Sequence, residues 1–247
     1  MTELAIIGGT GLARLKNLVV ERREAMHTPY GEPSAALTYG TLCGREVAFL
    51  PRHGDAHTIP PLRVNYRANL WCLKHAGVSK VISVCAVGGI REDIVPGGLV
   101  IPDQIIDYTW ARQHTFYEED LTEVIHIDFT EPYCEDLRRA LITAARQAGV
   151  SVTESGTYGA SQGPRLESAV EINRMERDGC HMVGMTGMPE TALARELGLC
   201  YAAIAVSANW AAGRGTEPIT MEVLHRNIDT GLEKAAAILE ALIRSND

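Results

Sequence analysis

Hydrophobic and polar positions follow two different periods along the chain, which predicts strands and helices in alternation. Continuous β-rich runs at 4–7, 80–87 and 199–207 are typical of strands buried on both faces. Further strands are predicted at 35–42, 45–51, 99–106, 150–158 and 182–185. Helical spacing predicts helices at 64–76, 132–148, 167–177, 189–197 and 219–243.

This alternation predicts an α/β fold, with a central mixed β-sheet flanked by helices. No repeat, low-complexity segment or linker divides the chain, so residues 1–247 are expected to form one domain. At 247 residues and 46% hydrophobic content, the chain can bury one sizeable core.

Composition argues against several classes of function. The formal net charge of −8 comes from 31 Asp and Glu against 23 Lys and Arg, which argues against nucleic acid as a partner. No apolar stretch is long enough to cross a bilayer, so no membrane association is expected. The N-terminus lacks a basic region and is predicted to be a first strand rather than a signal peptide.

The six cysteines follow neither a metal-binding nor a disulfide pattern. No Cys-x-x-Cys pair occurs and the gaps are long and uneven, so no metal site is expected. Cys72, Cys85 and Cys200 lie inside apolar runs. We therefore expect reduced cysteines and a cytoplasmic protein.

Small and polar residues follow the apolar strands, at the position where α/β sheets bind ligands. Glycines there let backbone N–H groups approach an anion, and Arg52 beside His53 offers a forked cation next to a titratable donor. Taken singly, each segment could equally be a tight turn or an exposed surface pair. The segments are Gly8-Gly9-Thr10-Gly11, Pro51-Arg52-His53-Gly54, Cys85-Ala86-Val87-Gly88-Gly89, Met185-Thr186-Gly187 and Ser207-Ala208-Asn209-Trp210.

In combination the motifs are more specific. They are Gly8-Gly9-Thr10-Gly11-Leu12, Arg52-His53-Gly54-x-x-His57-Thr58, Val64-Asn65-Tyr66-x-Ala68-Asn69, Gly163-Pro164-Arg165, Met185-Thr186-x-x-Pro189-Glu190 and Ala203-Ile204-Ala205. Their order and spacing resemble those of the trimeric purine nucleoside phosphorylases, and of the methylthioadenosine phosphorylase branch most closely. The resemblance runs from residue 4 to about residue 240.

The resemblance implies phosphorolysis of a purine nucleoside to a free purine and a ribose 1-phosphate. It implies no cofactor, small-molecule partners, and a homotrimer with active sites at subunit contacts. The phosphate-binding residues that it implies are Thr10, Arg52, His53, Cys85, Ala86 and Thr186, with Met185 under the ribose. Cys85 stands where the family has Thr, and because a thiol is a poor donor, the Ala86 backbone N–H is the stronger candidate.

Two departures from the methylthioadenosine branch concern the purine. That branch has Asp-x-Asp after its last strand and Ser after Gly-Pro-Arg-Phe, whereas this chain has Asn209-Trp210-Ala211 and Leu166-Glu167. Asn209 can donate to O6 while meeting N7, and Glu167 can accept from N1–H, which is the pair found in 6-oxopurine phosphorylases of the family. The alternative is that Glu167 is only an acid at a helix N-terminus.

The 5′ end of the substrate meets a different set of residues. Inosine and guanosine phosphorylases of the family place a His near the start of the C-terminal helix, where this chain has Met221 in an ungapped alignment. A Met-lined slot suits a thioether or a methyl group. Alternatives are a gap that brings in His225, or Met221 as plain helix core. The resemblance also suggests that His126 reaches the 5′ group of a neighbouring subunit, although an ordinary surface histidine is the alternative.

Together these features predict S-methyl-5′-thioinosine as the substrate, with Asn209 and Glu167 as the catalytic pair at the leaving purine. Leu166, Trp210 and Ala211 are expected beside them. The alternatives are a methylthioadenosine phosphorylase, an inosine or guanosine phosphorylase, and a nucleosidase that uses water. A purine-binding sensor without catalysis is the alternative from another class, and Cys85 is the feature that favours it.

Overall fold

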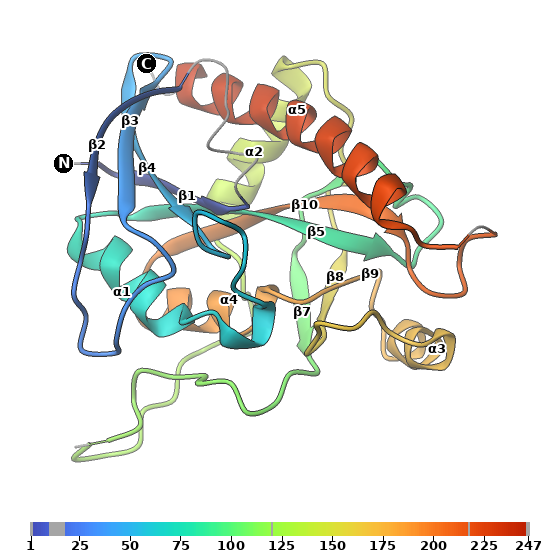
Figure 1. Cartoon of the computed structure of the whole chain (residues 1–247), viewed down its shortest axis with the longest axis horizontal. Helices are drawn as coiled ribbons and strands as arrows, with labels where there is room; N and C mark the ends of the chain where they lie inside the picture. The colour runs from blue at the N-terminus through green and yellow to red at the C-terminus, as the bar shows by residue number, and fades with distance from the viewer. Residues whose placement is uncertain (1, 10–17, 120, 217, 246–247) are drawn as a thin grey trace.

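The computed structural model describes residues 2–9, 18–119, 121–216 and 218–245 of the chain (Figure 1). The strands are β1 (Leu4–Gly8), β2 (Leu18–Glu24), β3 (Leu37–Leu42), β4 (Arg45–Pro51), β5 (Lys80–Gly89), β6 (Leu99–Val100), β7 (Gln104–Asp107), β8 (Thr157–Ala160), β9 (Met182–Gly184) and β10 (Cys200–Trp210). The helices are α1 (Tyr66–His75), α2 (Glu135–Gln147), α3 (Ala169–Arg177), α4 (Gly187–Glu196) and α5 (Met221–Ser245), with a 3-10 turn η2 (Pro61–Arg63).

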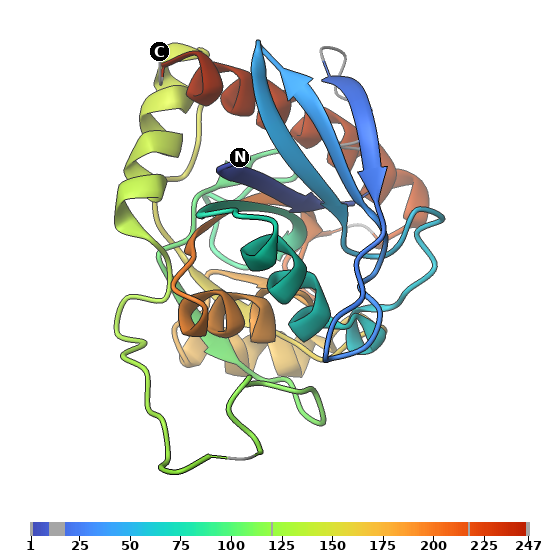
Figure 2. The ribbon, with the colours of Figure 1, turned by 90° about the vertical axis from the view of Figure 1, so that its left-hand side faces the viewer.

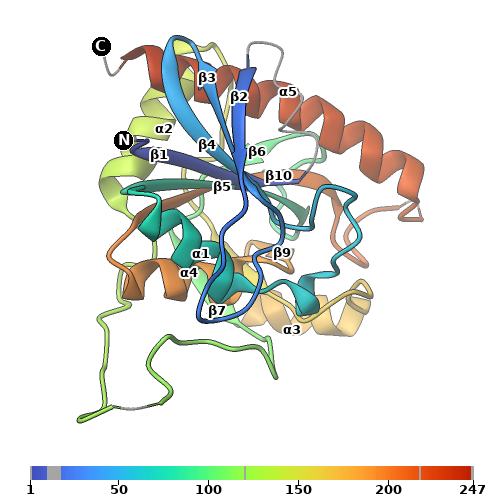
Figure 3. The ribbon, with the colours of Figure 1, turned by 60° about the vertical axis from the view of Figure 1, so that its left-hand side comes forward.

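A mixed sheet runs through the middle of the molecule, with helices on both of its faces. Its strand order is β2-β3-β4-β1-β5-β9-β8-β7, and β10 pairs with β5 and β6. Helices α2 and α5 lie on one side, and α1 and α4 on the other (Figure 3). Successive side chains of β1 point to opposite faces of the sheet. Ile6 packs in the cluster that includes α2 and α5, whereas Ala5 and Ile7 pack with α1 and α4. The predicted α/β fold is confirmed.

One strand of the structure was not predicted, and two predicted strands differ from it, each for a local reason. Strand β2 was not predicted, because it lies at the sheet edge, is exposed, and shows no apolar alternation. The predicted strand 99–106 is divided into β6 and β7 around Pro102, which has no N–H to donate. The predicted strand 150–158 is replaced by the shorter β8, and Thr153 forms only an isolated bridge with Val100.

The central strand β5 has two unequal edges. One edge pairs with β10 along its whole length, whereas the other pairs with β1 up to Ser83 and with β9 from Gly88 onward. Residues 84–87 therefore meet no strand on the second edge, and they form the open stretch of β5. Successive residues of a strand direct their N–H and C=O groups to opposite edges, and the Gly89 carbonyl accepts from Ala211 N on the β10 side. Even-numbered residues consequently direct these groups toward the open stretch.

Cys134, the N-cap of α2, forms a disulfide with Cys200, the first residue of β10. The expectation that all cysteines are reduced is wrong for this pair, because the fold brings together two residues that are 66 positions apart. The free cysteines of the described chain are Cys43, Cys72, Cys85 and Cys180. Since disulfides are rare in reducing compartments, the cysteines no longer argue for the cytoplasm.

Neither a membrane span nor a metal cluster is found in the part of the chain that the structure describes. None of its helices combines the length and the hydropathy needed to cross a bilayer. Its His, Cys, Asp and Glu side chains form no group of three or more that could hold a metal ion.

Removal of the Cys134–Cys200 disulfide should lower the free energy of unfolding by about 2–4 kcal/mol, because the bond restricts a long loop of the unfolded chain. Urea denaturation with and without a reductant measures this change. The reductant should lower the midpoint of the wild-type protein and leave that of Cys134→Ser unchanged. An unaltered wild-type midpoint, with reduction verified by thiol titration, would contradict the prediction.

Candidate functional site

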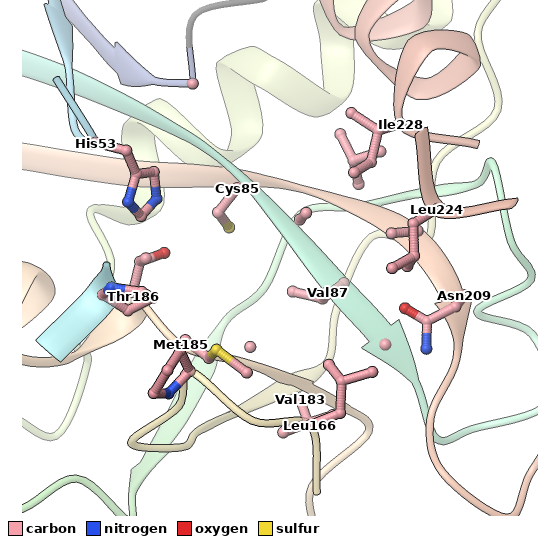
Figure 4. A pocket seen from close by; sticks show the side chains of 18 of the residues that line it. His53, Cys85, Val87, Leu166, Val183, Met185, Thr186, Asn209, Leu224 and Ile228 are labelled. Atoms are coloured by element: carbon pink, nitrogen blue, oxygen red, sulfur yellow. The ribbon is translucent and has the colours of Figure 1, made fainter. Parts of the chain in front are cut away.

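A cavity of about 570 Å³ lies against the open stretch of β5, between the ends of several strands and helix α5 (Figure 4). It brings together most of the predicted site residues, namely Arg52, His53, Cys85, Ala86, Leu166, Glu167, Met185, Thr186, Asn209, Ala211 and Met221. Trp210 is half-buried beside Gly215 and does not line the cavity. His126 is exposed and also lies outside it. Thr10 lies outside the described residues.

Arg52 is held rigidly at one end of this cavity. Its backbone N–H donates to the Gly8 carbonyl, so the end of β4 is joined to the end of β1. The residue is only 1% exposed. The Nη1 and Nη2 groups of its side chain donate to the Val84 carbonyl at 3.3 Å and the Ser83 hydroxyl at 2.7 Å. A guanidinium has five N–H groups. One Nη1 hydrogen is left without an acceptor among the described residues and can serve a ligand.

Glu190, which is fully buried in the first turn of α4, is the counter-ion of Arg52. The carboxylate accepts from Arg52 Nε at 2.6 Å and Nη2 at 2.9 Å, and from the Tyr201 hydroxyl at 2.8 Å. Burial raises the pKa of Tyr201 well above its usual range, so the phenol stays a donor. The positive charge predicted for the anion site is therefore balanced, and an anion must be bound mainly through hydrogen bonds. The sequence motif contained Glu190 but gave no indication of this role.

The His53 imidazole is held in place by its own loop. Its Nδ1 lies 2.8 Å from the carbonyl oxygen of Ile59, and its ring is 4.8 Å from that of His57. Burial, followed by the charge of neighbouring Arg52, lowers the pKa of His53 to about 4. The imidazole is thus neutral at ordinary pH.

Three further groups can donate to an anion beside Arg52. Ala86 is exposed and lines the cavity, whereas its neighbours in β5 are buried. Its backbone N–H points to the open edge of β5 because Val84, two residues earlier, bonds there. Thr186 presents its hydroxyl just before α4. Burial raises the pKa of the Cys85 thiol to about 12, so this group is a protonated and weak donor.

At the other end of the cavity, Asn209 and Glu167 provide polar groups. Glu167 precedes α3, whose N-cap is Ser168, so it is not an acid of the first helical turn. Its carboxylate accepts a hydrogen bond from the Ser161 hydroxyl. Asn209 Nδ2 donates to the Trp210 carbonyl at 2.6 Å, which leaves the amide oxygen and a second N–H for a ligand. Figure 4 shows Asn209 and Leu166 at the end of the cavity away from His53.

Met185 lies between these two ends and is fixed by its neighbours. A Cβ at Gly163 would stand 2.4 Å from Met185 Sδ, and Gly163 has a φ of +64°, so only glycine suits this position. Arg112 Nη1 donates to the carbonyls of Met185 at 2.8 Å and Met188 at 2.6 Å, and Nη2 donates to that of Gln162 at 2.8 Å. Arg112 therefore fastens the Met185 segment to the loop that carries Glu167. The role of Arg112 was not predictable from the sequence, because it depends on carbonyls distant in the sequence.

Helix α5 closes the cavity with an apolar face. Met221, Leu224, Ile228 and Leu232 follow one another at helical spacing, and every α5 side chain that lines the cavity is apolar. His225 is exposed and lies off this face. Met221 is 64% exposed, so it is a residue of the cavity mouth rather than of the helix core. The face suits an apolar substituent and offers no partner to a hydroxyl.

Known proteins resemble this chain over its whole length. Residues 3–244 match the sequence model of the Phosphorylase superfamily. A Pseudomonas syringae protein named probable S-methyl-5′-thioinosine phosphorylase is 49% identical over 246 residues, which cover 100% of both chains. A Pyrococcus furiosus protein named 6-oxopurine nucleoside phosphorylase is 47% identical over 225 residues, which cover 89% of this chain and 84% of the relative. The structure of methylthioadenosine phosphorylase from Schistosoma mansoni in complex with adenine is 32% identical, with a TM-score of 0.93, and the match covers 100% of this chain and 92% of that chain.

Replacement of Glu190 by Gln should lower the free energy of unfolding by about 3–5 kcal/mol, because Arg52 would keep a buried charge without its counter-ion. Urea denaturation at neutral pH measures the change. The matched control is Glu154→Gln, which removes an exposed ion pair with Arg146 and should cost less than about 1 kcal/mol. Equal losses in the two variants would contradict this account of Arg52.

Proposed function

Because the chain belongs to the phosphorylase superfamily, we propose that it catalyses the phosphorolysis of S-methyl-5′-thioinosine. A hydrogen phosphate oxygen attacks C1′, and the C1′–N9 bond breaks with its electron pair passing to the purine. The proton lost by hydrogen phosphate balances the one that the purine gains. The products are hypoxanthine and 5-methylthioribose 1-phosphate, and neither a metal nor an organic cofactor takes part.

One observation carries this proposal, namely the contrast between a polar end and an apolar face of a single cavity. Asn209 and Glu167 supply polar groups at one end, whereas α5 supplies only apolar side chains. A 6-oxopurine presents an acceptor at O6 and a donor at N1–H, which Asn209 and Glu167 can meet respectively. A 5′-methylthio group has no hydroxyl to satisfy, so it can lie against Met221 and Leu224 without loss of a hydrogen bond.

The anion end supplies what the chemistry requires. Cleavage of a glycosidic bond passes through an oxocarbenium-like transition state, and a phosphate dianion beneath C1′ offsets the developing positive charge. The remaining Arg52 N–H, the Ala86 N–H and the Thr186 hydroxyl can position that dianion without donating a proton to the sugar. In this scheme the purine, rather than the phosphate, needs the help of Asn209 and Glu167 as it leaves.

The proposal includes a homotrimer, with phosphate and a purine nucleoside as its small-molecule partners. His126 follows Val124 and Ile125, which are 75% and 43% exposed. These residues lie on the green segment that extends away from the body of the molecule in Figure 2. Exposed apolar side chains in one segment favour a contact surface. This position supports the expectation that His126 serves the 5′ group of a neighbouring subunit rather than of its own chain.

The specificity constant kcat/KM should be at least about tenfold higher for S-methyl-5′-thioinosine than for methylthioadenosine or inosine. Methylthioadenosine leaves a polar group unsatisfied at the base, and inosine leaves its hydroxyl unsatisfied at the 5′ end. Each unsatisfied group costs about 1–3 kcal/mol. Purine release with saturating phosphate measures all three constants. A preference for methylthioadenosine would contradict the base assignment, and a preference for inosine would contradict the assignment of α5.

Replacement of Asn209 by Asp should shift the preference toward 6-aminopurines, because a carboxylate accepts from an N6 amino group and repels O6. The measured quantity is the ratio of kcat/KM for methylthioinosine to that for methylthioadenosine, which should fall by at least about tenfold. Asn173→Asp makes the same chemical change outside the cavity and should leave the ratio unchanged. If Asn209→Asp lowered both constants equally, Asn209 would not select the base.

A further inference from the structure

The loop after β4 fixes which nitrogen of His53 carries a hydrogen. Nδ1 lies 2.8 Å from the Ile59 carbonyl oxygen, and the Ile59 N–H donates back to the His53 carbonyl at 3.0 Å. A carbonyl oxygen only accepts hydrogen bonds, so Nδ1 must be the donor of this pair. The two bonds close the loop on itself and hold the ring in one orientation.

The second nitrogen, Nε2, is therefore an acceptor. A neutral imidazole carries one hydrogen, and Nδ1 already has it. The charged and titratable groups nearest the ring are Arg52 and His57, which disfavour a second proton, and Glu190, which favours one but is engaged by Arg52. None of the described residues donates to Nε2. Figure 4 shows the ring pointing into the cavity on the side of Thr186 and Cys85.

Three groups that donate hydrogen bonds lie at the same end of the cavity as this lone pair. The free N–H of Arg52, the Ala86 N–H and the Thr186 hydroxyl each suit a bare oxyanion oxygen. A bare oxygen that faces Nε2 would instead bring two acceptors together, which leaves both unsatisfied. An oxygen that carries a hydrogen can donate to Nε2 and satisfy the whole set.

We propose that His53 selects the hydroxyl-bearing form of the anion: its Nε2 accepts a hydrogen bond from the P–OH group of hydrogen phosphate and thereby discriminates against oxyanions without a hydroxyl. The inference rests on the proposed function only in that phosphate is taken to be the anion of this cavity. It also gives the bound anion an orientation. With the P–OH group at His53, the unprotonated oxygens are left for the donors and for C1′.

Competition between anions tests this inference on the wild-type protein. At about pH 8, hydrogen phosphate, hydrogen arsenate and sulfate are all mainly dianions, and only sulfate lacks a hydroxyl. Isothermal titration without nucleoside should give dissociation constants for phosphate and arsenate within about threefold of each other, and a constant at least about tenfold higher for sulfate. If the site selected anions by size alone, the dissociation constant of sulfate would instead be close to that of phosphate. Sulfate binding as tight as that of phosphate would overturn the proposal.

Two variants test whether His53 is the residue that discriminates against sulfate. In His53→Gln the amide can present an N–H to sulfate, so the ratio of the sulfate to the phosphate constant should fall to within about threefold of unity. His75→Gln on α1 is the matched control, since it makes the same change outside the cavity, and it should keep the wild-type ratio. A His53→Gln variant that binds phosphate but keeps the full discrimination against sulfate would overturn the proposal.

These measurements separate the inference from the proposed function. Discrimination against sulfate by a protein that does not phosphorolyse S-methyl-5′-thioinosine would support the role of His53 and refute the function. Turnover with phosphate by a protein that binds sulfate as tightly as phosphate would support the proposed function and refute the role of His53.

Discussion

The buried ion pair between Arg52 and Glu190 connects the elements on which the candidate site depends. Arg52 directly follows β4, and Glu190 lies in the first turn of α4, 138 residues later. Through the same two side chains, the pair reaches Ser83 and Val84 on β5 and Tyr201 on β10. A bidentate guanidinium–carboxylate contact has a fixed geometry, so it holds these strand and helix ends in fixed positions relative to one another. The positions of Thr186 and Ala86 at this end of the cavity follow from it.

The pair also determines the electrostatic character of the site. Arg52 brings a full positive charge, but Glu190 balances it and neighbouring His53 stays neutral. A site of this kind recognises an anion by the direction and number of its hydrogen bonds rather than by charge alone. Such recognition can distinguish oxyanions of equal charge, which a simple cationic site cannot do. It also fits a reaction in which the anion must remain nucleophilic.

The shape of the cavity follows from the pairing of β5. Strand β1 covers the first part of one edge and β9 the last part, so the backbone between Ser83 and Gly88 faces a ligand instead of a strand. Arg112 then joins the Met185 segment to the loop before Glu167, and α5 covers the remaining side. The two ends and the middle of the cavity are thereby formed by different parts of the chain. Precise placement of reacting groups is a large part of what such a site can contribute to catalysis.

Sequence patterns predicted much of this arrangement, because strand ends and motif order are local properties. The positions of Arg52, Ala86, Thr186 and Asn209 around one cavity agree with those predictions. Features that depend on distant partners were not predictable. The balance of Arg52 by Glu190 and the Cys134–Cys200 disulfide require the tertiary fold.

The hydrogen-bond direction at His53 was not predictable for a similar reason. The residue type permits both donation and acceptance, and the Ile59 carbonyl decides between them. Edge strand β2 escaped prediction because an exposed strand carries no apolar alternation. Local patterns thus located the site, whereas its hydrogen-bond directions came from contacts between separate segments.

The most direct test of the account is to follow hypoxanthine release from S-methyl-5′-thioinosine as phosphate is added to phosphate-free protein. The account predicts that release is negligible without phosphate, saturates as phosphate increases, and is matched one for one by 5-methylthioribose 1-phosphate. Release that is independent of phosphate, with free 5-methylthioribose as the second product, would contradict it.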